Sequence, residues 1–384
     1  MKKIWPFTFY FLYFAAFSSL LPFFVIFYQH LGFSGTQIGL LTGVPPLITL
    51  FGAPLGTGLA DSTQRHRLIM GIGIAVAIGV ALALSAMTDF IPVFILIILF
   101  NIFMSPVASL SDSGTMSMLG KERGMYGRIR LGGTIGWGLF APIAGVLVQN
   151  LGLKIAFWVF SAIMLLNLLV SQKFVFAAPD GHAASEGGLR KLLKNRNWIF
   201  FLLFALLGGV GAFSVASYLY AYMAELGASE STMGFALTIA TLTELPVFFF
   251  GNHLIKRFTS YGLFMIALVL IGVRSLLYFL VDSPSMVLIV QVFSGMVFPA
   301  MWLAGVAYAD ENAPAGSKST AQGVFGAVTF GFGSAIGGFI GGLLLEAVGG
   351  RGMFLVFGIF ILAGMAIIEA VRRIIPDNTV PQPL

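Results

Sequence analysis

Apolar segments long enough to cross a bilayer recur along almost the whole chain. A helix needs roughly 20 apolar residues to span the hydrocarbon core. Only 9% of the residues are charged, against about 25% in ordinary soluble domains. The sequence therefore predicts an all-α membrane protein with twelve transmembrane helices. The predicted spans lie near residues 4–28, 36–60, 68–88, 91–118, 127–149, 153–174, 198–223, 232–255, 262–281, 285–309, 320–345 and 352–373.

One connection is long and polar, and it lies near the middle of the chain. Residues 176–197 are rich in Gly, Lys and Arg, which is typical of a linker. We therefore expect a six-helix bundle over residues 1–175, a cytoplasmic linker, a second six-helix bundle over residues 198–375, and a disordered tail over 376–384. Similar stretches that begin at Ser34 and Ser229, 195 positions apart, indicate an internal duplication, as in many transporters.

The basic residues predict the orientation of the chain. If the N-terminus is cytoplasmic, 18 of the 21 Lys and Arg residues fall on the inner side, as the positive-inside rule requires. We therefore expect a multi-pass protein of the plasma (inner) membrane with both termini in the cytoplasm. Because these residues lie in short loops between apolar spans, the net charge of +6 does not indicate a nucleic-acid partner. The 18 residues are Lys2, Lys3, Arg65, Arg67, Lys121, Arg123, Arg128, Arg130, Lys173, Arg190, Lys191, Lys194, Arg196, Lys256, Arg257, Lys318, Arg372 and Arg373.

The sequence lacks the motifs that are typical of metal binding, ATP hydrolysis and enzyme catalysis. The chain contains no Cys, and its four His residues show no ligand spacing, so no metal site is expected. A phosphate-binding Gly-x-x-x-x-Gly-Lys loop is absent, which argues against ATP-driven pumping. No nucleophile–base constellation is visible either. The sequence therefore predicts neither an enzyme nor a cofactor.

Two charges fall in the middle of predicted spans. Glu244 lies 13 residues from Ser231, which is roughly 20 Å along a helix, and Arg274 lies 12 residues from Gly262, or roughly 18 Å. Because burying a charge in the bilayer is expensive, such residues usually pair or carry function. The equal depths predict an ion pair near the midplane that works as a protonation switch: a proton on Glu244 frees Arg274 to hold an anion or a polar substrate. The alternative is a purely structural ion pair.

Two motifs resemble those of a known family. Gly58-Leu-Ala-Asp-Ser-Thr-Gln-Arg-His-Arg67 is similar to the loop signature of the major facilitator superfamily, although Ser62 and Gln64 replace the usual basic residue and glycine. Tyr126-Gly-Arg-Ile-Arg-Leu-Gly-Gly-Thr-Ile-Gly136 resembles the fifth span of the branch that contains lactose permease-like, phenylpropionate permease-like and nucleoside–proton symporters. The resemblance covers essentially the whole chain. It implies a central cavity between two bundles and transport by alternating access.

The resemblance also suggests roles for charges near the inner ends of the spans. Asp112 and Arg130 lie at matching depths in spans 4 and 5, where related symporters have an acid–arginine pair implicated in substrate binding or gating. The alternative is a purely structural contact that joins the inner ends of the two spans. Arg128 is a second possible partner of Asp112. Asp61 is predicted to be a gate residue that bonds the N-terminus of a neighbouring helix in one conformation only, with Arg65, Arg67 and Arg128 beside it. A solvated loop acid is the alternative.

Spans 1, 4, 7 and 10 line the cavity in this superfamily, so the resemblance implies that some of their polar and aromatic residues face the substrate. For the lone amides, bonds to neighbouring helices are the alternative reading. Besides Arg274, the candidate substrate-binding residues are Tyr13, Phe17, Asn101, Tyr218, Tyr222, Gln291 and Trp302.

The sequence therefore predicts a monomeric secondary transporter that takes up a small organic solute together with protons. Glu244 is the first candidate for the proton carrier, and Asp112 with Arg130 is the second. An aromatic carboxylate, a nucleoside and a sugar all remain possible substrates. A proton-driven efflux antiporter is the alternative within the same class, and a non-transporting sensor with the same fold is the alternative from another class.

Overall fold

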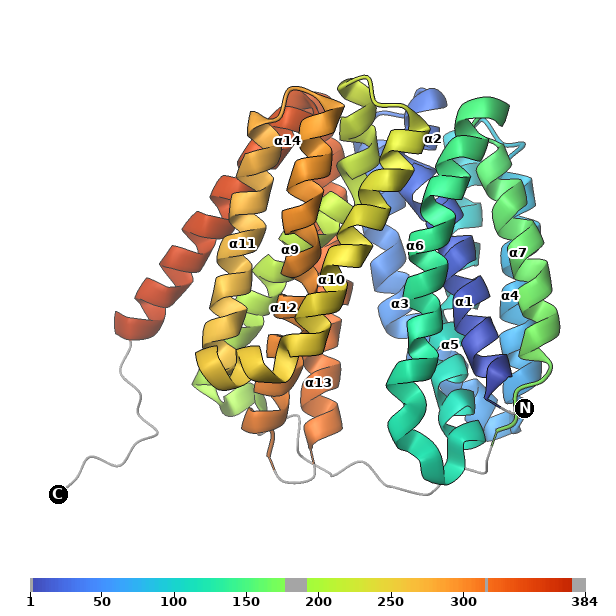
Figure 1. Ribbon diagram of the computed structural model, residues 1–384, viewed down its shortest axis with the longest axis horizontal. Helices are drawn as coiled ribbons and strands as arrows, with labels where there is room; N and C mark the ends of the chain where they lie inside the picture. Colours follow the sequence, from blue (N-terminus) through green and yellow to red (C-terminus); the bar gives the residue numbers. More distant parts are fainter. Residues whose placement is uncertain (1–2, 177–191, 315–316, 375–384) are drawn as a thin grey trace.

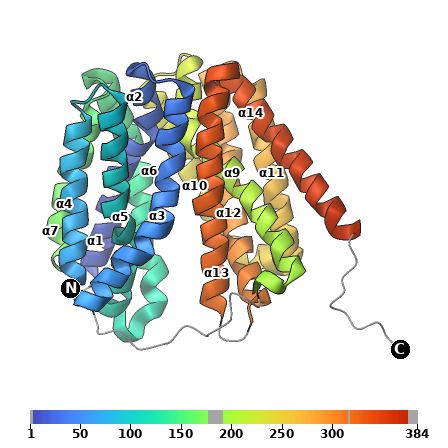
Figure 2. The ribbon, with the colours of Figure 1, turned by 180° about the vertical axis from the view of Figure 1, so that it is seen from behind.

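The computed structural model describes residues 3–176, 192–314 and 317–374, and these residues form a helical protein with two lobes (Figures 1 and 2). Part of the predicted linker and the predicted disordered tail lie outside the described residues. The N-terminal lobe contains α1 (Ile4–Leu20), η1 (Leu21–Phe23), α2 (Phe24–His30), α3 (Gly35–Thr63), α4 (His66–Leu84), α5 (Phe90–Leu119), η2 (Gly120–Met125), α6 (Tyr126–Leu151) and α7 (Ile155–Ser171).

The C-terminal lobe begins with α9 and ends with the long helix α14. Its elements are α9 (Arg196–Glu225), α10 (Glu230–Phe258), α11 (Ser260–Leu280), α12 (Pro284–Asn312), α13 (Lys318–Gly326), the π-helix η3 (Ala327–Gly333) and α14 (Ser334–Ile374). Within α14 the backbone turns at Gly349, where φ is +70°. This is a left-handed conformation that glycine adopts at little cost.

Apolar length accounts for the helices that the sequence predicted. Within the described residues, nine helical segments are long and apolar enough to cross a membrane. Two of them, Phe90–Leu151 and Lys318–Ile374, are far longer than one crossing and are interrupted at η2 and at Gly349. The helix Ile155–Ser171 is apolar but falls short of that length. The multi-span prediction is confirmed, and the count of twelve crossings stays a prediction.

The two similar sequence stretches begin equivalent helices. Ser34 caps α3, because its hydroxyl accepts a hydrogen bond from the Gln37 amide at 3.3 Å while the Gln37 side chain accepts one from the Ser34 amide at 2.9 Å. Ser229 caps α10 through the Thr232 amide at 3.3 Å. A serine at this position satisfies an amide that the helix itself leaves unpaired.

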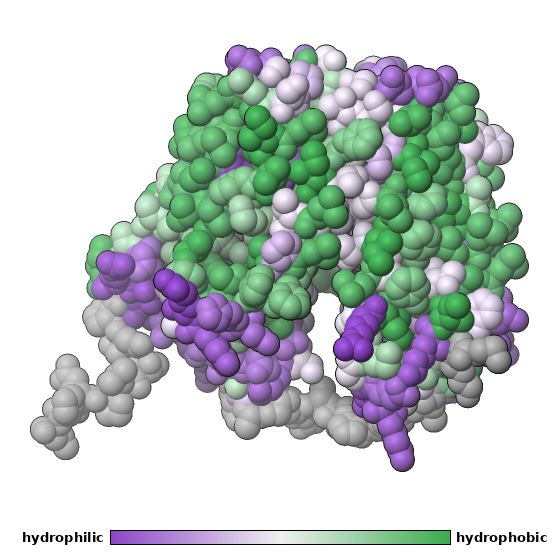
Figure 3. Space-filling view, in the orientation of Figure 1, coloured by the Kyte–Doolittle hydropathy of each residue, from purple (hydrophilic) through white to green (hydrophobic). Residues whose placement is uncertain are grey.

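The lobes touch at one end of the molecule and are separated at the other (Figure 1). At the closed end, which contains the turns at Gly32, Gly152, Gly227 and Gly349, α3 contacts α14 and α6 contacts α10. At the open end, the space-filling view is hollowed between the lobes and polar residues gather on both sides (Figure 3). The predicted topology makes the open end cytoplasmic.

Glycine lets the backbones of the two lobes meet at the closed end. A methyl group on Gly342 of α14 would lie 2.4 Å from the amide nitrogen of Gly39 and 2.5 Å from the carbonyl oxygen of Gly35. A methyl on Gly234 of α10 would lie 2.4 Å from the carbonyl oxygen of Ala141. No real methyl group fits so close to backbone atoms, and small residues are what allow membrane helices to approach in this way.

Replacing Gly342 by alanine should therefore force the closed end apart. Overpacking of this kind costs about 1–3 kcal/mol, so we expect Gly342→Ala to increase the population in which the closed end is open. The chain has no native cysteine, so a single Ser334→Cys probe can report this as faster labelling by an impermeant maleimide in intact cells. Gly79→Ala is the matched control, because Gly79 is exposed on α4 and a methyl there meets nothing within 4 Å. Equal labelling of the two variants would show that the contact is not tight.

Candidate functional site

A cavity of about 510 Å³ lies between the lobes, and three of the four predicted proton-coupling residues line it. We call it the charged compartment. Its walls come from both lobes, and three charged side chains, Arg130, Glu244 and Arg274, line it. Its other lining residues are Phe14, Pro22, Gly133, Thr134, Trp137, Ala212, Phe213, Val215, Ala216, Leu219, Tyr220, Leu237, Ala240, Thr241, Phe248, Gln291, Ser294 and Phe298.

Helical periodicity explains why these residues share one cavity. Residues three, four or seven apart lie on one face of a helix, and each wall repeats this spacing. The walls are Arg130, Thr134 and Trp137 on α6; Phe213, Ala216 and Tyr220 on α9; Leu237, Thr241, Glu244 and Phe248 on α10; and Gln291, Ser294 and Phe298 on α12.

Arg274 is buried, with 4% of its surface exposed, and its partners are neutral. Its Nη1 donates to the Ser294 hydroxyl at 3.2 Å, and its Nη2 donates to the Gly211 carbonyl at 2.9 Å. Its Nε has no hydrogen-bond partner among the described residues. The guanidinium charge is thus solvated by dipoles and has no ion-pair partner within the described part of the chain.

The predicted Glu244–Arg274 ion pair is wrong for this conformation. Both side chains line the charged compartment, but no ion pair joins them. The reason is packing: α11 packs mainly on α12 and α14, whereas α10 packs on α12 and α6. Arg274 therefore meets Ser294 on α12 instead of Glu244. Within the described residues, Glu244 forms no hydrogen bond, so its carboxyl group faces the cavity without a protein partner.

The predicted contact between Asp112 and Arg130 is confirmed. Arg130 Nη1 lies 3.1 Å from Asp112 Oδ1, and the side chains are 43% and 40% exposed. The same oxygen accepts hydrogen bonds from the hydroxyls of Tyr126, at 2.9 Å, and Tyr10. The Arg130 guanidinium also lies over the rings of Tyr10 and Phe14, at 5.3 and 5.6 Å from their centroids. Arg130 thus links this network at the open end to the charged compartment.

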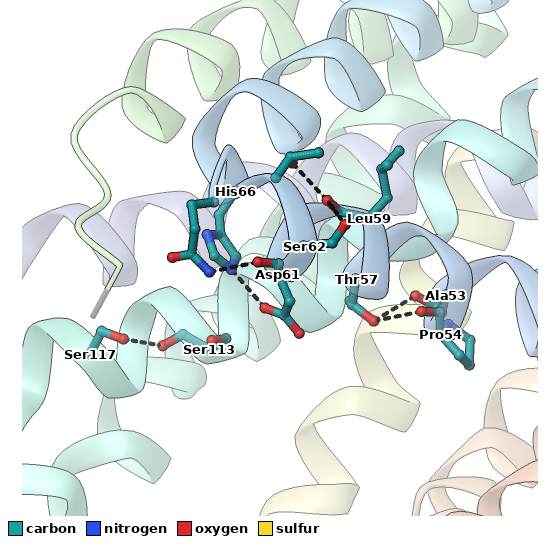
Figure 4. Close-up of polar contacts among 11 residues, drawn as sticks. Ala53, Pro54, Thr57, Leu59, Asp61, Ser62, His66, Ser113 and Ser117 are labelled. Carbon is teal, nitrogen blue, oxygen red and sulfur yellow. Dashed lines mark hydrogen bonds and ion pairs between the residues drawn. The ribbon is translucent and has the colours of Figure 1, made fainter. Parts of the chain in front are cut away.

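Asp61 contacts the first residue of the next helix (Figure 4). Its Oδ1 lies 2.7 Å from His66 Nε2, and its backbone oxygen accepts a hydrogen bond from the Gln64 side chain at 2.6 Å. Asp61 thus contacts the side chain of the first residue of α4, and its predicted bond to a helix N-terminus and its gating role stay predictions. The other predicted gate residues, Arg65, Arg67 and Arg128, are exposed, and the Asp112 ion pair is formed by Arg130 and not by Arg128.

A second cavity of about 900 Å³ adjoins the first, and none of the described residues that line it is charged. We call it the apolar compartment. Its walls include Phe17, Phe100 and Phe330, with a few hydroxyls and the Asn101 amide. Five residues line both compartments: Pro22, Trp137, Phe213, Ala216 and Leu237. Four of the predicted substrate residues thus line a compartment. Arg274 and Gln291 line the charged compartment, and Phe17 and Asn101 line the apolar compartment.

The other four predicted substrate residues do not line either compartment. The Tyr218 hydroxyl bonds the Gly338 carbonyl and lies 2.8 Å from the Thr42 hydroxyl, a contact between the lobes. Tyr222 donates to the Tyr278 carbonyl at 2.6 Å. Tyr13 packs on Phe17 and Trp302 packs on Phe330, with ring centroids 4.6 and 5.0 Å apart. In this conformation Tyr218, Tyr222 and Trp302 join different elements, whereas the ring contact of Tyr13 with Phe17 lies within α1.

Sequence reasoning missed several lining residues, of which Trp137 and Tyr220 are the most informative. Trp137 follows Arg130 by seven positions, so helical spacing could have placed both on one face of α6. Tyr220 lines the charged compartment, and its buried hydroxyl has no hydrogen-bond partner among the described residues. Nothing in the sequence distinguishes Tyr220 from its neighbours Tyr218 and Tyr222.

The charged compartment offers one carboxyl group, two guanidinium groups and several neutral donors. Within the described ranges, no three His, Cys, Asp or Glu side chains gather as ligands of a metal would. The arrangement can hold a proton on Glu244, an anion beside Arg274 and hydroxyl-bearing groups near Thr134, Thr241 and Ser294.

Comparisons with known proteins agree with this architecture. The chain is 29% identical over 378 residues to a maltose permease of Geobacillus stearothermophilus, covering 96% of this chain and 93% of that protein. It is 24% identical to a probable 3-phenylpropionic acid transporter of Escherichia coli (strain K12), covering 93% and 94%. The crystal structure of the nucleoside transporter NupG superposes with a TM-score of 0.85 at 17% identity, covering 97% of this chain and 99% of that one.

A family model gives the assignment. The model described as the MFS_1 like family matches residues 5–356, which is most of the chain. The motifs around Asp61 and Arg130 had indicated the same superfamily from sequence. The chain therefore belongs to the MFS_1-like family of membrane transporters.

Proposed function

We propose that the protein is a monomeric, proton-coupled symporter of the plasma membrane that takes up a small organic solute by alternating access. Its relatives are a maltose permease and a probable 3-phenylpropionic acid transporter, so a small solute is the natural cargo. The observation that carries the proposal is Glu244, whose carboxyl group has no hydrogen-bond or ion-pair partner among the described residues and faces the charged compartment far from either helix end.

Glu244 has the surroundings that a proton carrier needs. When Glu244 is protonated, its carboxyl group is a neutral hydrogen-bond donor, so the protein can change from one open arrangement of the lobes to the other at little electrostatic cost. Deprotonated, Glu244 needs water or a cation, and the open end supplies water. The charges and titratable groups that face it across the compartment are Arg130 from α6, Tyr220 from α9 and Arg274 from α11. None of these is an acid, so no other carboxyl group of this compartment competes for the proton.

The contacts at the closed end are suited to alternating access. The Glu346 carboxylate on α14 accepts a hydrogen bond from the Gly35 amide at 2.7 Å, and the Thr42 hydroxyl on α3 donates to the Gly338 carbonyl at 3.0 Å. Both bonds join the lobes and must break before the cavity can open at this end. Individual hydrogen bonds of this kind contribute about 1 kcal/mol, so the two arrangements can lie close in free energy.

Glu244→Gln should uncouple transport from protons. The amide has nearly the same shape but cannot carry a proton, so we expect solute exchange to continue while solute-driven proton uptake disappears. The measurement is the internal pH of proteoliposomes during solute addition, with aromatic acids, nucleosides and sugars as the panel. Glu230→Gln, on the same helix but outside both compartments, should keep normal coupling.

Two outcomes would contradict this assignment. If coupling survives in Glu244→Gln, Glu244 is not the carrier and Asp112 becomes the next candidate. If protons leave as solute enters in the wild-type protein, the protein is an antiporter.

Tyr220 supplies a second test, because it lines the charged compartment and its buried hydroxyl has no hydrogen-bond partner among the described residues. An unpaired buried hydroxyl costs about 1–3 kcal/mol, so Tyr220→Phe should leave the solute-free protein as stable as the wild type or more stable. Solute binding should weaken at the same time. Tyr222→Phe is the matched control: it loses a bond to the Tyr278 carbonyl and should lower the unfolding temperature.

Thermal unfolding in detergent with and without solute measures both effects. A loss of stability in Tyr220→Phe that equals the loss in Tyr222→Phe would show that the Tyr220 hydroxyl is already bonded within the protein.

A further inference from the structure

The charged compartment is lined by one buried positive charge, that of Arg274, which forms no ion pair within the described residues. Arg274 is 4% exposed, and its two identified hydrogen bonds go to neutral oxygens. Breaking or omitting one partner of a buried ion pair is costly, because the remaining charge is removed from water without an opposite charge beside it. A guanidinium group is well matched to a carboxylate, to which it can donate two parallel hydrogen bonds. The surroundings of Arg274 therefore favour the binding of an anionic group of the solute.

The apolar compartment is suited to bind the remaining, uncharged part of an anionic solute. It is the larger of the two cavities, its described lining residues include no charged side chain, and aromatic rings such as Phe17, Phe100 and Phe330 line it. Trp137 and Phe213 line both compartments, so the cavities share a boundary. A ligand with an anionic head near Arg274 and an apolar body beyond Trp137 would use both.

The charges of the compartment then decide how transport responds to voltage. Arg130 is balanced by Asp112. In the empty carrier the charges of Glu244 and Arg274 cancel. If one proton binds Glu244 and one carboxylate binds beside Arg274, the added charges cancel as well. With a neutral solute and a proton, the loaded carrier would have one extra positive charge and would respond to the membrane potential.

We infer that the solute is a monocarboxylate with an apolar body, held by Arg274 and the apolar compartment, and that it moves with one proton so that transport is electroneutral. The inference rests on the proposed proton coupling and adds the substrate class and the stoichiometry of charge. It makes Arg274 a substrate-binding residue and Trp137 a residue that determines specificity.

The test uses the full-length protein in proteoliposomes that contain a pH-sensitive dye, with the membrane potential set by potassium and valinomycin. The probes are 3-phenylpropionate, its neutral amide, maltose and uridine. Protein-free liposomes measure the passive permeation of the protonated acid, which is subtracted. We expect 3-phenylpropionate to accumulate along an inward proton gradient. Its accumulation ratio should be the same at zero potential and at about −120 mV, whereas a process that moves one charge would change it about tenfold per 59 mV.

Variants separate the binding of the head from the binding of the body. Arg274→Gln should reduce carboxylate exchange at least tenfold, and Arg274→Lys, which keeps the charge and guards against misfolding, should restore part of it. Trp137→Ala should raise the KM for 3-phenylpropionate several-fold. Trp158→Ala is its control, because Trp158 on α7 is 57% exposed and does not line either compartment.

The failure of this inference can be told from the failure of the proposed function. If maltose or uridine drives proton uptake that responds to potential, and the carboxylate does not, the inference is overturned while proton-coupled symport stands. If carboxylate accumulation rises with potential, the electroneutral stoichiometry is overturned. If no probe moves protons through the wild-type protein, both proposals are overturned.

Discussion

The free-energy cost of charge in a low-dielectric medium governs how this chain is organised. Moving an ionised side chain from water into hydrocarbon is so unfavourable that such groups are rare in membrane helices and face a cavity or a partner. Glu244 and Arg274 follow this rule without forming an ion pair, because both line the charged compartment. The cavity is therefore a condition for the stability of these two charges as well as a site for solute.

The cavity in turn depends on lobes that can separate without unfolding. At the closed end the contact consists of backbone against backbone, at Gly342 and Gly39, and of single hydrogen bonds such as Thr42 to Gly338. Aromatic side chains also meet across the lobes, as Phe23 and Tyr220 do with ring centroids 5.1 Å apart, and this packing has to be undone when the lobes part. The element η3 is a π-helix, and its residues Phe330 and Gly331 line the apolar compartment. Such π-helical turns are often found at functional sites.

The sequence was a good guide to whatever depends on length and on local spacing. Apolar length predicted the helices, and Asp112 and Arg130 were matched correctly because a short connection ties the ends of their helices together. The same depth argument failed for Glu244 and Arg274, because consecutive helices need not pack closely and α11 turns Arg274 toward Ser294 on α12. Depth along a helix is readable from sequence, whereas the direction a side chain faces depends on which helices become neighbours.

The boundary between the two compartments connects binding to movement. Trp137 belongs to α6 in the N-terminal lobe, and Phe213 belongs to α9 in the C-terminal lobe, so the shared boundary is built from both halves of the molecule. A solute that bridges the compartments contacts both halves at once. Its binding free energy then differs between arrangements of the lobes, which is the requirement for a ligand to shift a conformational equilibrium. A solute confined to one compartment would contact fewer residues that move relative to each other and would have less influence on the cycle.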